Sequence, residues 1–271
     1  MITVILTCFN RCERTVQCIN SIVQGNQLLK FHFVVVDDNS TDDTVTELKK
    51  IIKKGIKITI LRGSGKLYWS GGMREGIAYA KKNTLSEFYM LINDDVIFFE
   101  HVIESMLQNS CILTKILVGP TCDDKKQLSY GGIRYTGKGI AYKMIGPNES
   151  NRACDTFNAN CILMSQHIFF ELPNIDPKYC HSLGDFDYGL LAKHRGINSI
   201  VVDFYIGECQ DNFIQGTWRD TSLSIVKRIK LKEEIKGAPF SYWFYFLNKN
   251  FGLKKAIFYS LTPYLRILMK K

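Results

Sequence analysis

The sequence has little of what would place it in a membrane or among disordered chains. Its apolar stretches are shorter than the roughly 18 residues that a membrane-spanning helix needs, because Pro263 and Arg266 interrupt the most apolar one. Residues 1–7 contain no basic leader and no small-residue cleavage site, and are interpreted as a buried strand. With 46% hydrophobic and 23% charged residues, the 271-residue chain is expected to be a globular cytosolic protein.

Cysteine motifs are also missing. The nine cysteines contain no CxxC pair, and no cysteine–histidine spacing is of the kind that binds zinc. We therefore expect reduced thiols rather than a disulfide framework or a zinc site.

The positive charge is confined to one end of the chain. The net charge is +9, yet residues 1–224 hold 24 basic and 24 acidic residues. Residues 225–271 hold eleven basic and two acidic residues and so carry the whole excess. A neutral body with a basic tail is predicted.

The first hundred residues alternate between short apolar runs and segments of helical periodicity. The runs at 2–7, 32–37, 56–62 and 87–93 are rich in β-branched and aromatic residues, which is typical of strands. This alternation predicts an α/β fold with a Rossmann-like, mainly parallel sheet and helices on both faces. Ligands of such sheets bind at the carboxyl ends of the strands.

The second half of the chain has a different character. Between about 115 and 165 it is rich in glycine and tyrosine, which predicts hairpins and a mixed extension of the sheet. A helix is predicted over 185–195 and a strand over 199–204.

Two predicted strands end in pairs of aspartates, Asp37-Asp38 and Asp94-Asp95. Carboxylates at this edge could bind Mg²⁺ or Mn²⁺, or the donor groups of a nucleobase and ribose. Helix caps and turns favour the same residues, so each pair alone leaves the choice open.

Glycine-rich turns follow the third strand. Residues 63–65, Gly71 and Gly72 leave room for the backbone to approach a ligand, and Ser70 is predicted to cap a helix over 71–82. Two cations nearby face either phosphates or solvent: Lys66 and Arg74.

The helix predicted from residue 184 begins with acidic residues. Asp185 either caps the helix or removes a proton from an attacking hydroxyl, whereas Asp187 is interpreted as a favourable charge in the first turn. His181 lies just upstream. We interpret it as a structural hydrogen-bonding group in preference to a ligand.

Taken in order, five segments resemble the family 2 glycosyltransferases of GT-A fold, within them the rhamnosyltransferase-like enzymes of bacterial capsule, O-antigen and exopolysaccharide synthesis. The resemblance covers roughly residues 1–220 and rests on the joint order of the motifs. The segments are Thr-Cys-Phe-Asn-Arg, Val-Val-Asp-Asp-Asn-Ser-Thr-Asp, Gly-x-Gly-x-Leu-Tyr-Trp-Ser-Gly-Gly-Met, Leu-Ile-Asn-Asp-Asp-Val and Leu-Gly-Asp-Phe-Asp-Tyr-Gly.

The resemblance implies a role for individual residues. Asp95 would hold a divalent metal, Mn²⁺ or Mg²⁺, on the diphosphate, Asp38 would contact the base or ribose, and Asp185 would be the catalytic base. The other nucleotide-sugar-binding residues implied are Thr7, Phe9, Asn10, Arg11, Gly71, Gly72, Arg74, Asn93 and Asp94. Marginal candidates are Lys66, Trp69, Asp187, His181 and Trp218.

The resemblance also implies a reaction and a domain plan. An inverting, metal-dependent enzyme would move a sugar from a nucleotide-sugar to a glycan acceptor. Residues 1–224 would form the catalytic domain, with a nucleotide-sugar half of about 1–112 and an acceptor half of about 113–224. Gly184 stands where the family commonly has Glu, and residues 215–218 lack the motif of processive synthases, so one sugar per encounter is expected.

The basic tail, residues 225–271, contains ten aromatic residues between 240 and 264. Basic and aromatic residues together on helices favour contact with an anionic membrane, so a peripheral position at the inner face of the cytoplasmic membrane and a lipid-linked acceptor are predicted. A helix hairpin packed on the core or a homodimer interface comes next. Nucleic acid is not expected as a partner, because the neutral body contains no nucleic-acid motif.

Two other functions are compatible with an α/β fold of this kind. A non-catalytic membrane-associated scaffold would keep the fold without turnover, but Asp38, Asp95 and Asp185 argue against it. A sugar-phosphate nucleotidyltransferase is disfavoured because the loop after the first strand, residues 7–11, contains no glycine.

Overall fold

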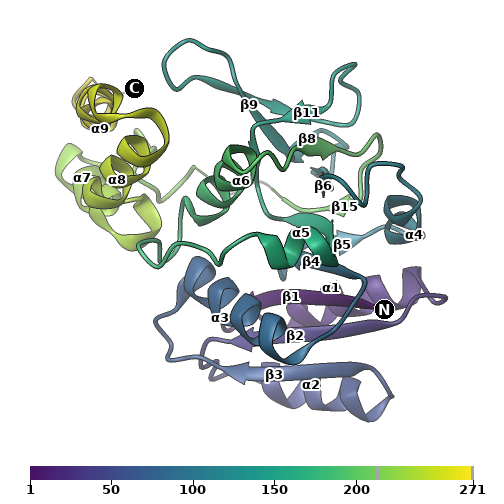
Figure 1. The fold of residues 1–271 in the computed structure, drawn as a ribbon. Helices are drawn as coiled ribbons and strands as arrows, with labels where there is room; N and C mark the ends of the chain where they lie inside the picture. The colour runs from purple at the N-terminus through teal and green to yellow at the C-terminus, as the bar shows by residue number, and fades with distance from the viewer. Residues whose placement is uncertain (211–213, 270–271) are drawn as a thin grey trace.

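The computed structural model describes residues 1–210 and 214–269 and is built on one large central sheet (Figure 1). The strand order of this sheet is β11-β14-β6-β13-β4-β1-β2-β3. Its parallel part consists of β1 (Ile2–Cys8), β2 (Phe31–Asp37), β3 (Lys57–Arg62) and β4 (Phe88–Ile92). The predicted α/β fold with a mainly parallel sheet is confirmed.

The rest of the central sheet is mixed, as predicted. β13 (Cys161–Ser165) is antiparallel to both β4 and β6 (Ile116–Val118), whereas β14 (Ser199–Val201) is parallel to β6. β11 (Ala153–Cys154) closes this edge. The strand predicted over 199–204 is therefore shorter than expected, and the chain leaves the sheet after Val201.

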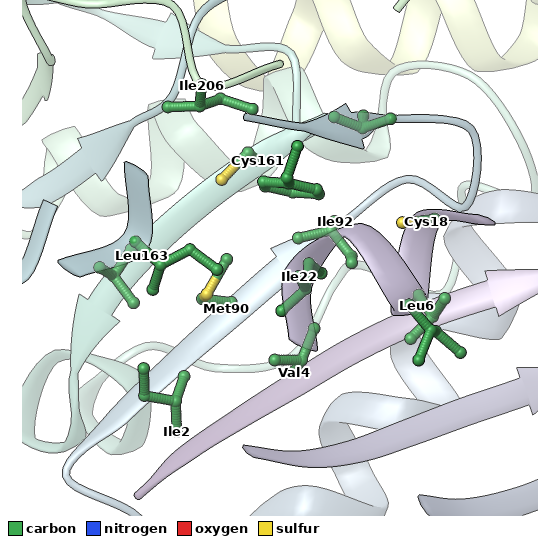
Figure 2. Packing of buried hydrophobic residues seen from close by; sticks show 14 of the residues in the cluster. Ile2, Val4, Leu6, Cys18, Ile22, Met90, Ile92, Cys161, Leu163 and Ile206 are labelled. Carbon is green, nitrogen blue, oxygen red and sulfur yellow. The ribbon is translucent and has the colours of Figure 1, made fainter. Parts of the chain in front are cut away.

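Helices cover both faces of the sheet. One face packs against α1 (Cys12–Gly25), α2 (Thr44–Lys53) and α4 (Val102–Leu107), and Figure 2 shows part of this core, where Val4 and Leu6 of β1 lie near Cys18 and Ile22 of α1. The other face packs against α3 (Tyr68–Asn83), α5 (Gln166–Glu171) and α6 (Gly184–His194). Alternate residues of β1 enter the two cores, which is what a strand buried on both sides requires.

Two small sheets accompany the central sheet. The first consists of β9 (Gly132–Tyr135), β10 (Tyr142–Ile145) and β12 (Thr156–Phe157). The second consists of β5 (Ile97–Phe98), β7 (Thr121–Cys122), β8 (Leu128–Tyr130) and β15 (Gly207–Glu208).

The helix predicted over 71–82 begins earlier, at Tyr68, and Ser70 is therefore not its N-cap. The carboxylate of Asp38 instead accepts hydrogen bonds from the N–H groups of Leu67 (2.9 Å) and Tyr68 (3.1 Å). The carboxylate of Asp38, which directly follows β2, thus caps the helix in place of Ser70, the residue predicted to do so. Ser70 lies in the first turn, where its hydroxyl donates to the carbonyl of His181 (2.7 Å).

The tail forms α7 (Ile225–Glu233), a 3₁₀ turn (Ile235–Gly237), α8 (Phe240–Phe251) and α9 (Leu253–Leu268). Phe246 and Leu247 of α8 and Ala256 of α9 form a third core with Tyr179 and Leu190. The tail therefore packs on the body, as the alternative of a helix hairpin packed on the core predicts. None of the helices described is long and apolar enough to cross a membrane.

An ion pair between a buried carboxylate and a partly exposed lysine links α6 to α8. Lys249 donates to Asp187 (2.7 Å) and Asp176 (2.8 Å), while Asn250 (2.9 Å) and Tyr179 (3.2 Å) donate to the other oxygen of Asp187. Asp187 lies in the first turn as predicted, but it is buried, so its interpretation as a favourable charge on the helix dipole is incomplete. Its main partner comes from the tail, which makes the tail a support of α6.

Removing the positive charge of Lys249 should destabilise the protein. Lys249→Met leaves Asp187 buried without its main counter-charge, and we expect a loss of about 3 kcal/mol in the free energy of unfolding. Urea unfolding measures it, with the exposed Lys254→Met as the matched control on α9. A loss equal to that of the control would contradict a stabilising role.

Candidate active site

The aspartate pair after β4 is bound to an arginine from the loop after β1. Nη1 of Arg11 donates to Oδ1 of Asp94 (3.3 Å) and to Oδ2 of Asp95 (3.0 Å). Asp94 is 7% exposed at its side chain and also accepts from the hydroxyl of Thr15 (3.2 Å). Burial raises the pKa of Asp94 to about 6, against the opposing effects of Arg11 and Thr15.

Asp95 is the more accessible member of the pair. Its side chain is 22% exposed, and its second oxygen faces the thiol of Cys209 (3.6 Å). Neither aspartate caps a helix, because the chain turns here into β5. The helix-cap alternative is therefore wrong for Asp94 and Asp95, and a partly exposed carboxylate stands at the edge of the sheet.

The aspartates after β2 are neutralised differently. Asp38 is buried and accepts hydrogen bonds from the N–H groups of Gly65 (2.7 Å), Leu67 and Tyr68. Asp37 accepts from the N–H of Ser40. Backbone groups thus already satisfy much of Asp38's acceptor capacity, and this carboxylate holds the glycine-rich turn against β2.

Glycines near this turn make room for protein atoms. A Cβ at Gly63 would come within 2.6 Å of Asp38, and one at Gly72 within 2.1 Å of Thr7. Gly72 therefore allows α3 to approach β1 closely, and Gly71 is buried beside it. The proposed contacts of Thr7, Gly71 and Gly72 with a donor stay predictions.

The remaining donor-side candidates surround the aspartate pair or brace it. Phe9 is 49% exposed at this edge, and Asn10 bonds to the N–H of Thr41 (2.8 Å). Trp69 donates its indole N–H to Asn93 (2.7 Å), which precedes Asp94. Arg74 donates to the carbonyl of Tyr179 (3.2 Å), and thus supports the chain before α6.

Asp185 lies at the start of α6. Its carboxylate accepts from the N–H groups of Phe186 (2.9 Å) and Ala159. The residue keeps some exposure, but burial of the carboxylate raises its pKa to about 6. The group is ionised at pH 7 and basic enough to accept a proton, which is what a general base needs.

A short connection between β12 and β13, residues 158–160, joins Asp185 to the aspartate pair. Ala159 donates to Asp185, and the next residue, Asn160, accepts from the N–H of Asn93 (3.1 Å). Asn160 also donates to the sulfur of Cys209, which faces Asp95. The structure therefore brings Asp185 and the Asp94-Asp95 pair to one region.

His181 lies beside the first turn of α3, where its carbonyl accepts from Ser70. Its ring packs edge-on against Tyr68, with ring centroids 6.1 Å apart. Burial, with nearby Lys236 and Arg11, lowers its pKa to about 4, so the imidazole is neutral at pH 7. Its buried Nδ1 finds no hydrogen-bond partner within residues 1–210 and 214–269.

Three marginal candidates lie apart from this cluster. Lys66 is exposed in the glycine-rich turn, and Asp187 belongs to the ion pair with Lys249. Trp218 lies in the loop before α7, with Arg219 stacked over its ring at 5.3 Å.

Several residues of the region escaped the sequence analysis: Thr15, Ala159, Asn160 and Cys209. None belongs to a recognisable motif, and each bonds to a partner far away in the sequence. Gly184 has a similar explanation, because a Cβ there would come within 2.3 Å of Ser70 Oγ. The glycine at this position lets α6 contact α3.

A family model identifies the family of the chain. The sequence model described as glycosyl transferase family 2 matches residues 3–169, more than half of the chain. The chain belongs to glycosyl transferase family 2. It is a glycosyltransferase, and no curated protein sequence matches it.

Solved structures show the same fold at low sequence identity. The structure of S. aureus TarS 1–349 has a TM-score of 0.59 and 13% identity, covering 98% of this chain and 80% of that one. The mannosyltransferase PcManGT from Pyrobaculum calidifontis, in complex with GDP-Man and Mn²⁺, has a TM-score of 0.59 and 10% identity, covering 99% and 74%. GalNAc-T7 with UDP, GalNAc and Mn²⁺ gives 0.56 and 12%, covering 97% and 57%.

The contact between α6 and α3 in this glycosyltransferase is open to a direct test. Gly184→Ala places a methyl group against Ser70, and we expect a loss of about 1–3 kcal/mol in the free energy of unfolding. Ser70→Gly removes the colliding atoms and should recover part of that loss in the double variant. Gly71→Ala, whose Cβ would lie 3.3 Å from Leu67, is the control. Equal urea midpoints for Gly184→Ala and the control would contradict the close contact.

Proposed function

We propose that this glycosyltransferase moves one sugar from a nucleotide-sugar to a glycan acceptor, with inversion at the anomeric carbon and with a divalent cation. The observation that carries the proposal is the placement of two different acidic groups in one region. Asp95 is partly exposed beside Arg11 at the end of β4, while Asp185 is a desolvated base at the start of α6.

The residues at the end of β4 fit Mg²⁺ or Mn²⁺. These cations prefer carboxylate oxygens, and proteins commonly supply one or two of them while substrate phosphates and water complete the shell. Asp95, with Asp94 beside it, provides such a set, whereas no cluster of three His, Cys, Asp or Glu ligands occurs in the described residues. A bound cation would neutralise negative charge on the leaving diphosphate. Arg11 would have to release part of its contact with Asp95.

The donor is proposed from fold relatives together with the position of the cluster. TarS 1–349 has been solved with UDP-GlcNAc and PcManGT with GDP-Man. Ligands of α/β sheets bind at the carboxyl ends of the strands, where Asp95 and Asp38 lie in this chain. We propose that the chain belongs to the rhamnosyltransferase-like branch and acts in bacterial surface-polysaccharide synthesis.

Asp185 is proposed to take the proton from the acceptor hydroxyl as that oxygen attacks the anomeric carbon. In-line attack from the face opposite the leaving diphosphate inverts the configuration. Bonds from two backbone N–H groups orient the carboxylate, and Lys249, through Asp187, anchors the helix that bears it.

A peripheral membrane position and a lipid-linked acceptor are supported by α9. A row of exposed apolar side chains runs along this helix, with Lys254 within it and residues 225–271 strongly basic. The row consists of Leu253, Ile257, Phe258, Leu261, Leu265 and Leu268. An apolar row among cations is the pattern that anionic lipid surfaces bind, so we place the enzyme at the inner face of the cytoplasmic membrane.

The role of Asp185 predicts a pH dependence. Its raised pKa means that protonation removes the base as the pH falls through about 6, so kcat/KM should decline below that value and level off above it. Asp185→Asn should lower kcat by about 10²-fold or more. Because the neutral amide avoids the cost of burying a charge, its urea midpoint at pH 7 should not fall. A pH-independent rate between 5 and 7 would contradict the assignment.

Asp95 is tested without any acceptor. We expect the wild-type protein to hydrolyse its nucleotide-sugar slowly in the presence of Mn²⁺ or Mg²⁺, and Asp95→Ala to need at least about tenfold more metal for half-maximal rate. Asp124→Ala, an exposed aspartate in the turn before β8, is the control. No hydrolysis of any nucleotide-sugar by folded wild-type protein would favour the non-catalytic scaffold instead.

A further inference from the structure

A cavity of about 860 Å³ lies between the β9–β10 hairpin, the start of α6 and the C-terminal helices. Its size is within the range of pockets that enclose small ligands. It lies on the acceptor side of the molecule, away from the acidic residues at the ends of β2 and β4, and none of those aspartates lines it. It therefore differs from the proposed donor site.

The floor of the cavity is aromatic and aliphatic. Tyr142 of the hairpin and Phe186 of α6 have ring centroids 6.1 Å apart, and Trp243 and Phe246 of α8 stack at 5.6 Å. Aliphatic side chains complete this surface: Ile140, Leu183, Leu231 and Pro263. An apolar floor of this kind gains free energy from covering a hydrocarbon chain.

The rim of the cavity is cationic. Lys138, Arg219, Lys236 and Arg266 come from four separate segments, are exposed and line the same cavity. In the part of the chain that the structure describes, none of the four forms an ion pair, and Glu234 is the single acidic residue of the lining. Cations that converge without acidic partners favour an anionic ligand.

The polar groups of the lining do not suit a sugar chain. Apart from Glu234 and the cations, the side chains that could bond to sugar hydroxyls are those of one serine, two threonines and three tyrosines, beside the indoles, with no Asn, Gln, Asp or His among the lining residues described. A polyol or glycan would leave many hydroxyls against an apolar floor, which is costly. The combination of an apolar floor and a cationic rim fits an amphiphile with an anionic head.

The cavity adjoins the proposed catalytic base. Phe186 directly follows Asp185, and Tyr135 lies close enough to Asp185 to feel its charge. The pKa of Tyr135 is raised mainly by burial, and further by Tyr142, Asp155 and Asp185. A ligand held in the cavity can therefore present an attached group to Asp185.

We propose that this cavity binds a lipid phosphate, with the hydrocarbon chain on the aromatic floor and the phosphate at the rim formed by Lys138, Arg219, Lys236 and Arg266. The inference rests on the proposed function in one respect, since it makes the lipid phosphate the carrier of the acceptor. The exposed apolar row of α9 would then hold the same end of the molecule at the membrane from which the lipid enters.

Binding can be measured on the full chain without donor or metal. Trp218 and Trp243, two of the three tryptophans, line the cavity and report on it by fluorescence. We expect farnesyl phosphate, below its micellar concentration, to bind at least about tenfold more tightly than farnesol, and glycerol phosphate to bind more weakly than either, because both parts of the ligand contribute.

Variants locate the phosphate. Lys236→Gln with Arg266→Gln should weaken farnesyl phosphate binding about fivefold or more and leave farnesol binding unchanged, because only the charged contacts are lost. Lys49→Gln with Lys53→Gln, two exposed lysines of α2, is the matched control and should bind both ligands as the wild type does.

Three results would overturn the proposal: equal affinity for farnesyl phosphate and farnesol, equal affinity for glycerol phosphate and farnesyl phosphate, or unchanged binding by the double variant. Equal binding of glycerol phosphate would point to a polyol-phosphate acceptor instead. Metal-dependent hydrolysis of the nucleotide-sugar, measured on the same preparations, separates this failure from a failure of the proposed function. Hydrolysis without lipid-phosphate binding contradicts only the cavity assignment.

Discussion

Negative charge at the carboxyl edge of the sheet is the constraint on which the rest of this structure depends. Buried or partly buried carboxylates are costly unless hydrogen bonds or cations compensate them. Each acidic strand end has its own solution: backbone N–H groups surround Asp38, and Arg11 bridges Asp94 and Asp95. The hydrogen bonds to Asp38 stabilise the glycine-rich turn. Arg11, in contrast, leaves Asp95 partly accessible, so that another cation could take its place.

The cost of a buried carboxylate also links the tail to α6. Asp187 is buried in α6, and its counter-charge, Lys249, comes from α8. The tail therefore supports the helix that carries Asp185, besides forming one wall of the aromatic cavity. A segment whose composition suggested a membrane contact thus has a structural role, and the proposed membrane contact involves a different face, the exposed row on α9.

The sequence predicted the sheet and most helices because their signals are local: β-branched runs, helical periodicity and acidic strand ends. It also predicted that Asp38 and Asp95 lie at the same edge, since parallel strands bring their carboxyl ends to one edge. What it missed depends on distant partners. Lys249 lies 62 residues after Asp187, Ser70 and Gly184 meet only in the folded chain, and Asp38 caps a helix from another strand. No local pattern distinguishes such residues from solvated or flexible ones.

The most direct test of the central claim, that the acidic edge is a metal-assisted donor site, is thermal unfolding with UDP-, GDP-, dTDP- and CMP-sugars, each with and without Mn²⁺ or Mg²⁺. A ligand that binds only the folded state at 100 times its Kd stabilises it by about 2.7 kcal/mol. The account predicts that one nucleotide class raises the unfolding temperature and that this rise depends on the cation. A folded protein that no nucleotide-sugar stabilises under either condition would contradict it.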